Sequence, residues 1–285
     1  MSLLSRISWR WQLWLLNAAG MLYFFALLLG ALAIGLLVTI PDVYKNDLDT
    51  MHRRRLAAVF VFVSLLLNFA CLRYYSTRSH LKADNFMLPQ SGEETAVCRT
   101  CQISRPPRAK HCSLCDVCVL KRDHHCFFGG CCVGFHNQRY FIVFCFYTAI
   151  GALYSTSVTF SYLSNHYADI LSLEFYRLLP PWLIWHWYYG YITVNIVAMV
   201  LFAYFNFMAF TAGLFYFIFQ CFLLWRGQAS YEFFTGVKRY SHSLWENLRS
   251  VFGPWWFLNF LVPLPFLRSP DDGFVWRVVH DFKQM

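Results

Sequence analysis

Four long apolar runs, each free of Asp, Glu, Lys and Arg, constrain this chain more than any other feature of its sequence. The runs cover residues 16–40, 56–72, 140–163 and 191–225. A helix that crosses a bilayer needs about 20 apolar residues, with a lower limit near 17. The first run also exceeds the roughly 7–15 apolar residues of a signal peptide. Only 14% of the 285 residues are charged, against roughly 25% in soluble domains. The sequence therefore predicts an all-α membrane protein with four transmembrane helices.

The distribution of basic residues predicts the orientation in the membrane. Four crossings place residues 1–15, 73–139 and 226–285 on one side, and these segments hold 19 of the 24 Lys and Arg residues. The positive-inside rule makes that side cytoplasmic. The net charge of +9 follows from this bias and from attraction to anionic lipid. No base-reading module accompanies the basic residues, so no nucleic-acid partner is expected.

The cysteines cluster between the second and third apolar runs. Eight of the eleven lie between Cys98 and Cys132, together with three histidines. The cytosol is reducing, which disfavours disulfides and favours metal binding or catalysis. Structural zinc takes four nitrogen or sulfur ligands, so two sites would use eight of the eleven candidates. Three groups then remain, and a reactive thiol beside a histidine can be among them.

The spacing within this segment is specific. The stretch from Cys98 to about residue 141 resembles the cysteine-rich domain of the DHHC-type protein S-acyltransferases, the palmitoyltransferases. Two later stretches are similar to the family's Thr-Thr-x-Glu and Asn-x-x-x-Val-Phe-Gly elements, namely residues 229–232 and 247–253. The matching positions inside the cysteine-rich stretch are Arg105-Pro106, Arg108, His111-Cys112, Cys115, Cys118, Asp123-His124-His125-Cys126, Cys132 and Asn137.

The resemblance implies two structural zinc ions held by interleaved ligands. One set would be Cys98, Cys101, His111 and Cys118, and the other would be Cys112, Cys115, His125 and Cys132. Closed four-ligand sites leave no open position for catalysis by the metal.

The resemblance also implies an enzyme that works in two steps. Cys126 would attack a long-chain acyl-CoA, with palmitoyl-CoA as the expected donor. The acyl-enzyme would then pass its acyl group to membrane-proximal cysteines of protein substrates. His124 is the expected base for the Cys126 thiol, and Asp123 would orient His124. Five basic residues are candidates for contacting CoA phosphates, or alternatively form a solvated or headgroup-facing surface: Arg105, Arg108, Lys110, Lys121 and Arg122.

Three departures from the family pattern bear on these roles. Phe127-Phe128 replaces the usual Pro-Trp, Cys131 replaces a polar residue, and Ala229 removes one hydroxyl from the Thr-Thr-x-Glu element. Cys131 is either a bystander thiol or an acceptor close to the nucleophile. Glu232 is expected to anchor the C-terminal segment through an arginine.

The expected segments are residues 1–72 with two membrane helices, 73–139 with the zinc module, 140–225 with two further helices, and 226–285. Residues 178–189, rich in Trp and Tyr, are expected at the membrane interface. The expected location is the Golgi or the endoplasmic reticulum, with the zinc module in the cytoplasm. Two other functions remain open. One is a membrane adaptor whose zinc module docks partners. The other is a membrane-anchored zinc ubiquitin ligase, although the sequence lacks the ligand spacing of such a ligase.

Overall fold

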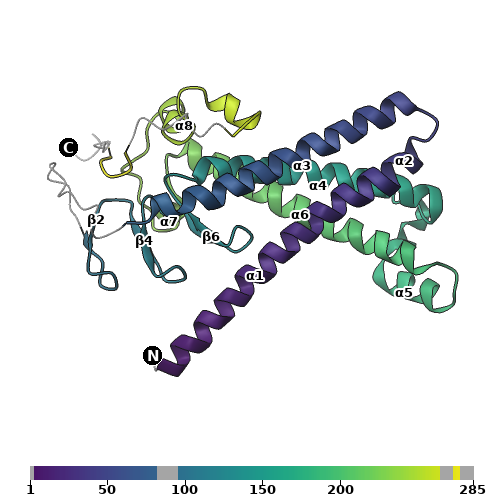
Figure 1. Ribbon diagram of the computed structural model, residues 1–285, viewed down its shortest axis with the longest axis horizontal. Coiled ribbons are helices and arrows are strands. Elements are labelled where there is room, and N and C mark those ends of the chain that lie inside the picture. The colour runs from purple at the N-terminus through teal and green to yellow at the C-terminus, as the bar shows by residue number, and fades with distance from the viewer. Residues whose placement is uncertain (1–2, 82–95, 264–271, 277–285) are drawn as a thin grey trace. The chain divides into compact units, whose positions relative to one another are not determined.

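The computed structural model describes residues 3–81, 96–263 and 272–276. Four of its helices are long and apolar enough to cross a membrane, which confirms the predicted number (Figure 1). They extend over Trp11–Val43, Leu48–Ser79, Gln138–His166 and Val194–Trp225. The long fourth apolar run forms one continuous helix. The segment before it forms a short separate helix rich in aromatic residues, α5.

The helices have the following bounds. The first span comprises α1 (Leu3–Ile34), a π-helical turn (Gly35–Thr39) and α2 (Ile40–Val43). The second is α3 (Leu48–Ser76), which ends in a 3₁₀ turn (Thr77–Ser79). The third is α4 (Gln138–His166), and the fourth is α6 (Val194–Trp225). The shorter elements are a 3₁₀ turn (Leu173–Leu178), α5 (Pro180–Tyr188), α7 (Ser230–Phe234), α8 (Leu244–Phe252) and a 3₁₀ turn (Trp256–Phe260).

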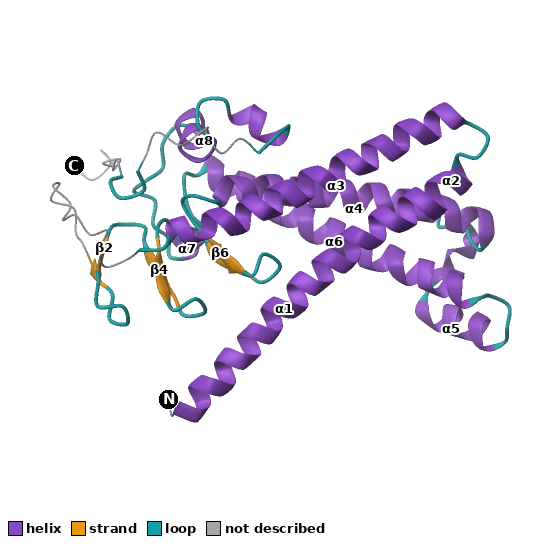
Figure 2. Ribbon diagram, in the orientation of Figure 1, coloured by secondary structure: helices purple, strands orange, loops and turns teal. Residues whose placement is uncertain are grey.

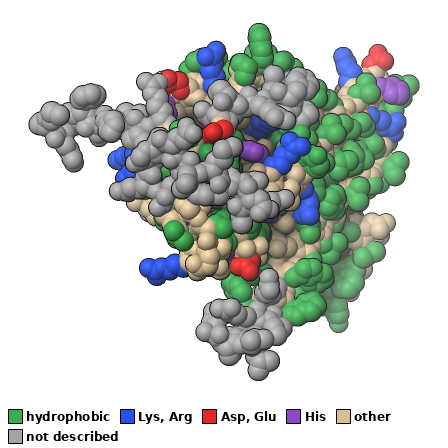
Figure 3. All heavy atoms as spheres, turned by 60° about the vertical axis from the view of Figure 1, so that its left-hand side comes forward, with side chains coloured by type: hydrophobic (Ala, Val, Ile, Leu, Met, Phe, Trp, Pro, Cys, Tyr) green, Lys and Arg blue, Asp and Glu red, His purple; other side chains and the backbone are tan. Residues whose placement is uncertain are grey.

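Apolar side chains remain on the outside of these helices. Leu22, Leu37 and Leu56 are each at least 70% exposed. Hydrophobic side chains cover much of the surface shown in the space-filling view, outside the residues drawn in grey (Figure 3). Exposed apolar surface of this extent marks a membrane-facing protein, since soluble monomers rarely tolerate it.

The cysteine-rich segment contains three short antiparallel hairpins (Figure 2). They pair β1 (Ala96–Val97) with β2 (Ser104–Arg105), β3 (Lys110–Cys112) with β4 (Val117–Val119), and β5 (His124–Cys126) with β6 (Cys131–Val133). Each strand is two or three residues long, so none has an apolar face wide enough to form a core. The hairpins must therefore be held by other interactions.

The chain divides into two compact units, and each long helix contributes a segment to both. One unit comprises residues 25–65 and 145–215. Its core contains Leu163 of α4, Leu183 of α5 and Val200 of α6. The other unit comprises residues 1–24, 66–144 and 216–285, and it contains all three hairpins.

Aromatic packing joins three helices inside this second unit. Phe24 of α1 stacks on Phe69 of α3 with a centroid separation of 4.7 Å. Phe24 also makes an edge contact with Phe144 of α4 at 5.2 Å. Next to the hairpins, the buried Asn137 donates to the carbonyls of Leu72 and Cys132, 3.0 and 2.9 Å away. These contacts fix the ends of α3 and α4 against β6.

Within the first unit, α6 packs tightly against α4 at a glycine. A Cβ added at Gly213 would lie only 2.9 Å from the backbone nitrogen of Ala149. By contrast, a Cβ added at Gly35 would meet nothing within 4 Å. Small residues at such crossings let transmembrane helices pack backbone to backbone.

We expect Gly213→Ala to lower the apparent melting temperature by several degrees, because overpacking costs about 1–3 kcal/mol. Gly35→Ala is the matched control and should leave the melting temperature unchanged or slightly raised, since Ala is the better helix former. Both melting temperatures are measured by heating the detergent-solubilised protein and monitoring the folded fraction by size-exclusion chromatography. Equal melting temperatures for the two variants would contradict the close packing.

Candidate active site and metal centres

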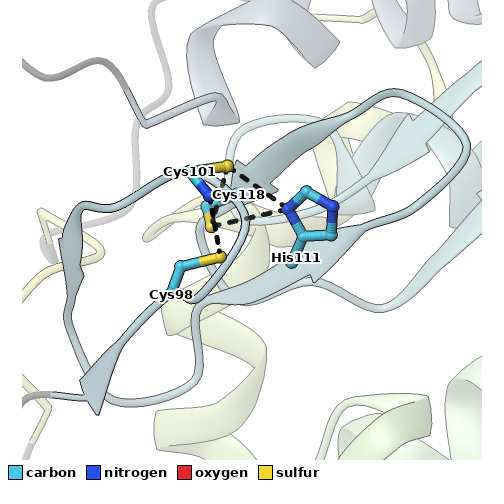
Figure 4. A group of neighbouring side chains, drawn as sticks. All are labelled: Cys98, Cys101, His111 and Cys118. Carbon is cyan, nitrogen blue, oxygen red and sulfur yellow. Dashed lines mark hydrogen bonds between the residues drawn. The ribbon is translucent and has the colours of Figure 1, made fainter.

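The first candidate metal centre is formed by Cys98, Cys101, His111 and Cys118 (Figure 4). The first two cysteines flank a turn after β1, and His111 and Cys118 are paired opposite each other on β3 and β4. The His111 Nδ1 atom lies 3.3 Å from Cys101 Sγ and 4.0 Å from Cys118 Sγ. The three sulfurs and the ring nitrogen therefore converge on one point.

The second candidate centre is formed by Cys112, Cys115, His125 and Cys132. His125 and Cys132 are paired opposite each other on β5 and β6. The His125 Nδ1 atom lies 3.3 Å from Cys115 Sγ and 3.7 Å from Cys132 Sγ. The adjacent residues His111 and Cys112 thus point into different centres, as successive side chains of a strand must.

Both groups fit zinc. A tetrahedral zinc with Zn–S distances of about 2.3 Å holds its ligand atoms roughly 3.5–3.8 Å apart. All four ligand atoms of each group lie within 4.8 Å of one another. The donor set of three thiols and one imidazole is typical of structural zinc. These are the eight residues that the family resemblance pairs in the same two sets.

A residue of the first helix supports the second centre. The His125 Nε2 atom lies 3.0 Å from the side-chain oxygen of Asn17 in α1. With Nδ1 facing the sulfurs, Nε2 carries the proton and donates to Asn17. Such a partner fixes the ring orientation and the tautomer of a metal-binding histidine. Nothing in the sequence near the cysteines indicates Asn17, since it lies 108 residues away.

The structure also brings together Asp123, which immediately precedes β5, and His124, the first residue of that strand. The His124 Nδ1 atom lies 2.8 Å from Asp123 Oδ2. The Cys126 thiol lies close enough to raise the pKa of His124. Its ring makes an edge contact with Phe141 and lies parallel to Tyr216. The acid and the imidazole are hydrogen-bonded, and the thiol lies near the imidazole.

Asp123 is held by residues that are distant in sequence. Gln220 of α6 donates from Nε2 to Asp123 Oδ2 over 2.8 Å. The backbone N–H of Ser230, at the start of α7, donates to Asp123 Oδ1 over 2.6 Å. Gln138 in turn donates to Gln220 over 3.2 Å. The element that resembles Thr-Thr-x-Glu, residues 229–232, thus contacts Asp123 through the backbone amide of Ser230. This contact does not need the Ser230 side chain.

These hydrogen bonds set the charges at the site. Burial opposes ionisation of Asp123, but the hydrogen bonds from His124, Ser230 and Gln220 outweigh it and lower the Asp123 pKa to about 2. Burial likewise lowers the His124 pKa, but hydrogen bonds to Asp123 and Cys126 outweigh it and raise the pKa to about 9. The pair is therefore an ion pair at neutral pH.

Cys126 lies at the end of β5, where a four-residue turn leads to β6. Its side chain is buried, and the backbone N–H of Gly129 donates to its sulfur over 3.3 Å. Phe127 contacts His125 edge-on, and Phe128 packs beside Tyr23 of α1. The two phenylalanines that replace Pro-Trp therefore pack on the second metal centre and on the first helix.

Cys131 follows the same turn, at the start of β6. Burial raises the pKa of its thiol to about 12, so Cys131 stays protonated at neutral pH.

Arg108 is the arginine that anchors Glu232. The Arg108 Nε atom lies 2.6 Å from Glu232 Oε1, and a second nitrogen lies 2.7 Å from Oε2. Arg108 also donates to the carbonyl of Gly227 and lies over the ring of Trp276, 4.4 Å from its centroid. Both charged groups are buried. The pair fixes the segment after α6 against the cysteine-rich segment.

The other four basic candidates lie on the same segment. Lys121 is buried, with its Nζ 5.6 Å from the centroid of the Trp276 ring. Lys110 is half-buried over Tyr231. Arg105 and Arg122 are also half-buried. Their role toward CoA stays a prediction.

Comparisons with known proteins agree with this geometry. The family model described as DHHC palmitoyltransferase matches residues 91–237. Palmitoyltransferase ZDHHC22 of Danio rerio is 30% identical over 284 residues, which cover 95% of this chain and 99% of the relative. Probable palmitoyltransferase ZDHHC24 of Mus musculus is 36% identical over 198 residues, 64% of this chain and 63% of the relative. Palmitoyltransferase ZDHHC22 of Homo sapiens is 28% identical and covers 88% of this chain and 93% of its own length.

We expect about two zinc ions per chain by elemental analysis. Asn17→Ala should lower the zinc affinity of the second centre about 10–100-fold in chelator titrations, because His125 loses the partner that orients it. Gln12→Ala, which changes an exposed side chain on the same helix, is the control and should leave both zinc affinities unchanged. A zinc-free protein, or equal chelator sensitivity of the two variants, would contradict the assignment.

The Arg108–Glu232 ion pair should show strong energetic interaction in a double-mutant cycle. Arg108→Met or Glu232→Leu alone leaves one buried charge without its partner, which costs about 3–5 kcal/mol. The double variant should lose at least about 2 kcal/mol less than the sum of the single losses. Thermal unfolding in detergent measures the four proteins, and additive losses would show that the ion pair contributes little.

Proposed function

Because the chain belongs to the DHHC palmitoyltransferase family, we propose that it transfers a long-chain acyl group, palmitoyl, from acyl-CoA to cysteine thiols of membrane-associated proteins. The observation that carries the proposal is the hydrogen bond from His124 to Asp123, with the Cys126 thiol beside the imidazole. A thiol needs an adjacent base to act as a nucleophile, and the base needs an orienting partner. His124 and Cys126 lie on the short strand β5, and Asp123 immediately precedes it.

In the first step, His124 holds the proton of the Cys126 thiol and the resulting thiolate attacks the carbonyl carbon of the acyl-CoA thioester. The new bond joins that carbon to Cys126 Sγ, and the bond to the CoA sulfur breaks. His124 then delivers its proton to the departing CoA thiolate. Asp123 stabilises the imidazolium, as the acid of a catalytic triad does.

In the second step, His124 accepts the proton of a substrate cysteine as that thiol attacks the acyl-enzyme. The bond to Cys126 breaks, and the acyl group leaves on the substrate. The Gly129 N–H, which donates to Cys126 Sγ, stabilises negative charge on this sulfur when it attacks and when it departs. The sequence of two thioester exchanges makes the mechanism ping-pong.

The zinc ions would supply rigidity rather than chemistry, since each group has four protein ligands and no open position. Cys98, Cys101, His111 and Cys118 would hold one ion and Cys112, Cys115, His125 and Cys132 the other. The second centre shares β5 with Cys126, so ligation of His125 fixes the strand that carries the nucleophile.

The surroundings suit a lipid-like donor. Phe141 and Tyr216, which contact the His124 ring, lie on the helices α4 and α6. An acyl chain that leaves Cys126 along these helices would gain about 0.8 kcal/mol for each buried methylene group. Arg105, Lys110, Lys121 and Arg122 are proposed to attract the phosphates of CoA. Arg108 already forms a buried ion pair with Glu232, so we assign it a supporting role.

We further propose that the cysteine-rich segment faces the cytoplasm of the Golgi or the endoplasmic reticulum. The excess of basic residues on the side that carries it supports this orientation. Acyl-CoA donors and the cysteines of peripheral membrane proteins would then meet at that face.

Incubation of the purified protein with labelled palmitoyl-CoA tests the proposed function. The wild type should acquire label that hydroxylamine removes, and Cys126→Ser should acquire none. His124→Ala should slow labelling by about 10²–10⁴-fold, since general acid–base catalysis contributes that much. Cys221→Ser, an exposed thiol on α6, is the matched control and should label normally. An unlabelled wild type with both zinc ions bound would favour the adaptor function instead.

A further inference from the structure

Cys131 lies opposite the proposed nucleophile. In the β5–β6 hairpin, Cys126 and Cys131 are the pair that closes the turn. Directly opposed residues of antiparallel strands have Cα atoms about 4.5–5.5 Å apart. The two sulfurs lie 3.6 and 3.4 Å from the same point, the position that a Cβ at Gly129 would occupy. The two sulfurs therefore lie on the same side of the turn and no more than 7.0 Å apart.

The turn between them is firmly held. Arg73 donates to the carbonyl of Gly129 over 2.8 Å. The N–H of Gly130 donates to the carbonyl of Phe127 over 3.2 Å. Gly129 itself has no side chain to separate the sulfurs, and a Cβ there would also press against Leu72 at 3.2 Å. These contacts keep Cys131 facing Cys126.

Burial does not distinguish the two thiols. Cys126 is 6% exposed and Cys131 is 9% exposed. Neither belongs to the two metal groups. Any acyl chain that reaches Cys126 in this enclosed site also comes within reach of Cys131.

We propose that Cys131 is a second acyl-carrying residue, which receives the acyl group from Cys126 by intramolecular thioester exchange. This inference rests on the proposed function, because it needs the acyl-enzyme at Cys126. Two thiols held side by side exchange an acyl group far faster than free thiols at ordinary concentrations.

The exchange is balanced without any further reactant. Cys131 Sγ forms a bond to the carbonyl carbon while the bond from that carbon to Cys126 Sγ breaks. The proton of the Cys131 thiol passes to the departing Cys126 sulfur. One thioester and one thiol remain, so the equilibrium stays within about tenfold of unity.

The surroundings of the two sulfurs differ, and this difference suits Cys131 to storing the acyl group. Cys126 is the thiol that interacts with His124, whereas the Cys131 thiol faces the carbonyl of Leu72, 4.0 Å from its sulfur. An acyl group on Cys131 would thus lie beside the Leu72 carbonyl, and we expect water to attack it more slowly than an acyl group on Cys126. Cys131 would store the acyl group and return it to Cys126 when a substrate thiol arrives.

The experiment maps the acyl group on the full-length protein. The protein, kept reduced with a phosphine, is mixed with one equivalent of palmitoyl-CoA, quenched in acid and digested. Fragmentation of the peptide that contains both cysteines assigns the acyl position. We expect about a tenth or more of the acyl groups on Cys131. Cys126→Ser should carry none at either position, and Cys131→Ser should carry acyl on Cys126 alone and lose it to water several-fold faster than the wild type.

Three outcomes would overturn the relay. Acyl confined to Cys126 in the wild type, at a detection limit of about 1%, shows that no exchange occurs. Acyl on Cys131 in Cys126→Ser shows direct transfer from acyl-CoA. Equal hydrolysis rates in the wild type and in Cys131→Ser remove the storage role. A wild type without acyl at any position would instead contradict the proposed function. Zinc content near two per chain confirms that each variant is folded.

Discussion

The buried carboxylate of Asp123 is the group on which the arrangement of the site depends. A charge inside a protein is tolerated only when it is paired and hydrogen-bonded. Asp123 meets this requirement through His124, Gln220 and the amide of Ser230. Those partners come from a hairpin, from a membrane helix and from the segment after it. One carboxylate therefore aligns the imidazole and at the same time joins the three parts of the chain that surround it.

A second buried ion pair supports the first. Arg108 and Glu232 connect the cysteine-rich segment to the short helix α7. Glu232 also accepts from the amide of Ala229, one residue before the amide that donates to Asp123. The backbone at 229–230 is thus fixed from both sides. At position 229 this contact is made by the backbone amide, which alanine supplies as well as threonine would.

The sequence predicts those parts of the molecule that depend on composition and spacing. The four membrane helices follow from uncharged runs, and the eight metal-binding residues follow from a spacing that the chain shares with a family. Asn17 and Gln220 could not be found in this way, because nothing distinguishes them from the other amides of their apolar helices and their partners are far away in the sequence. The three hairpins were also beyond prediction, since strands of two or three residues have no periodicity. Tertiary contacts alone determine these features.

The alternation of ligands along β3 has a consequence for how this segment can vary. His111 and Cys112 are neighbours in sequence but belong to different metal groups. A shift of β3 against β4 by one residue would turn every side chain to the opposite face, and it would give each centre the ligand meant for the other. The length of the chain between successive ligands is therefore as constrained as their identity. Insertions and deletions between Cys98 and Cys132 should be far more damaging than substitutions of the residues in between.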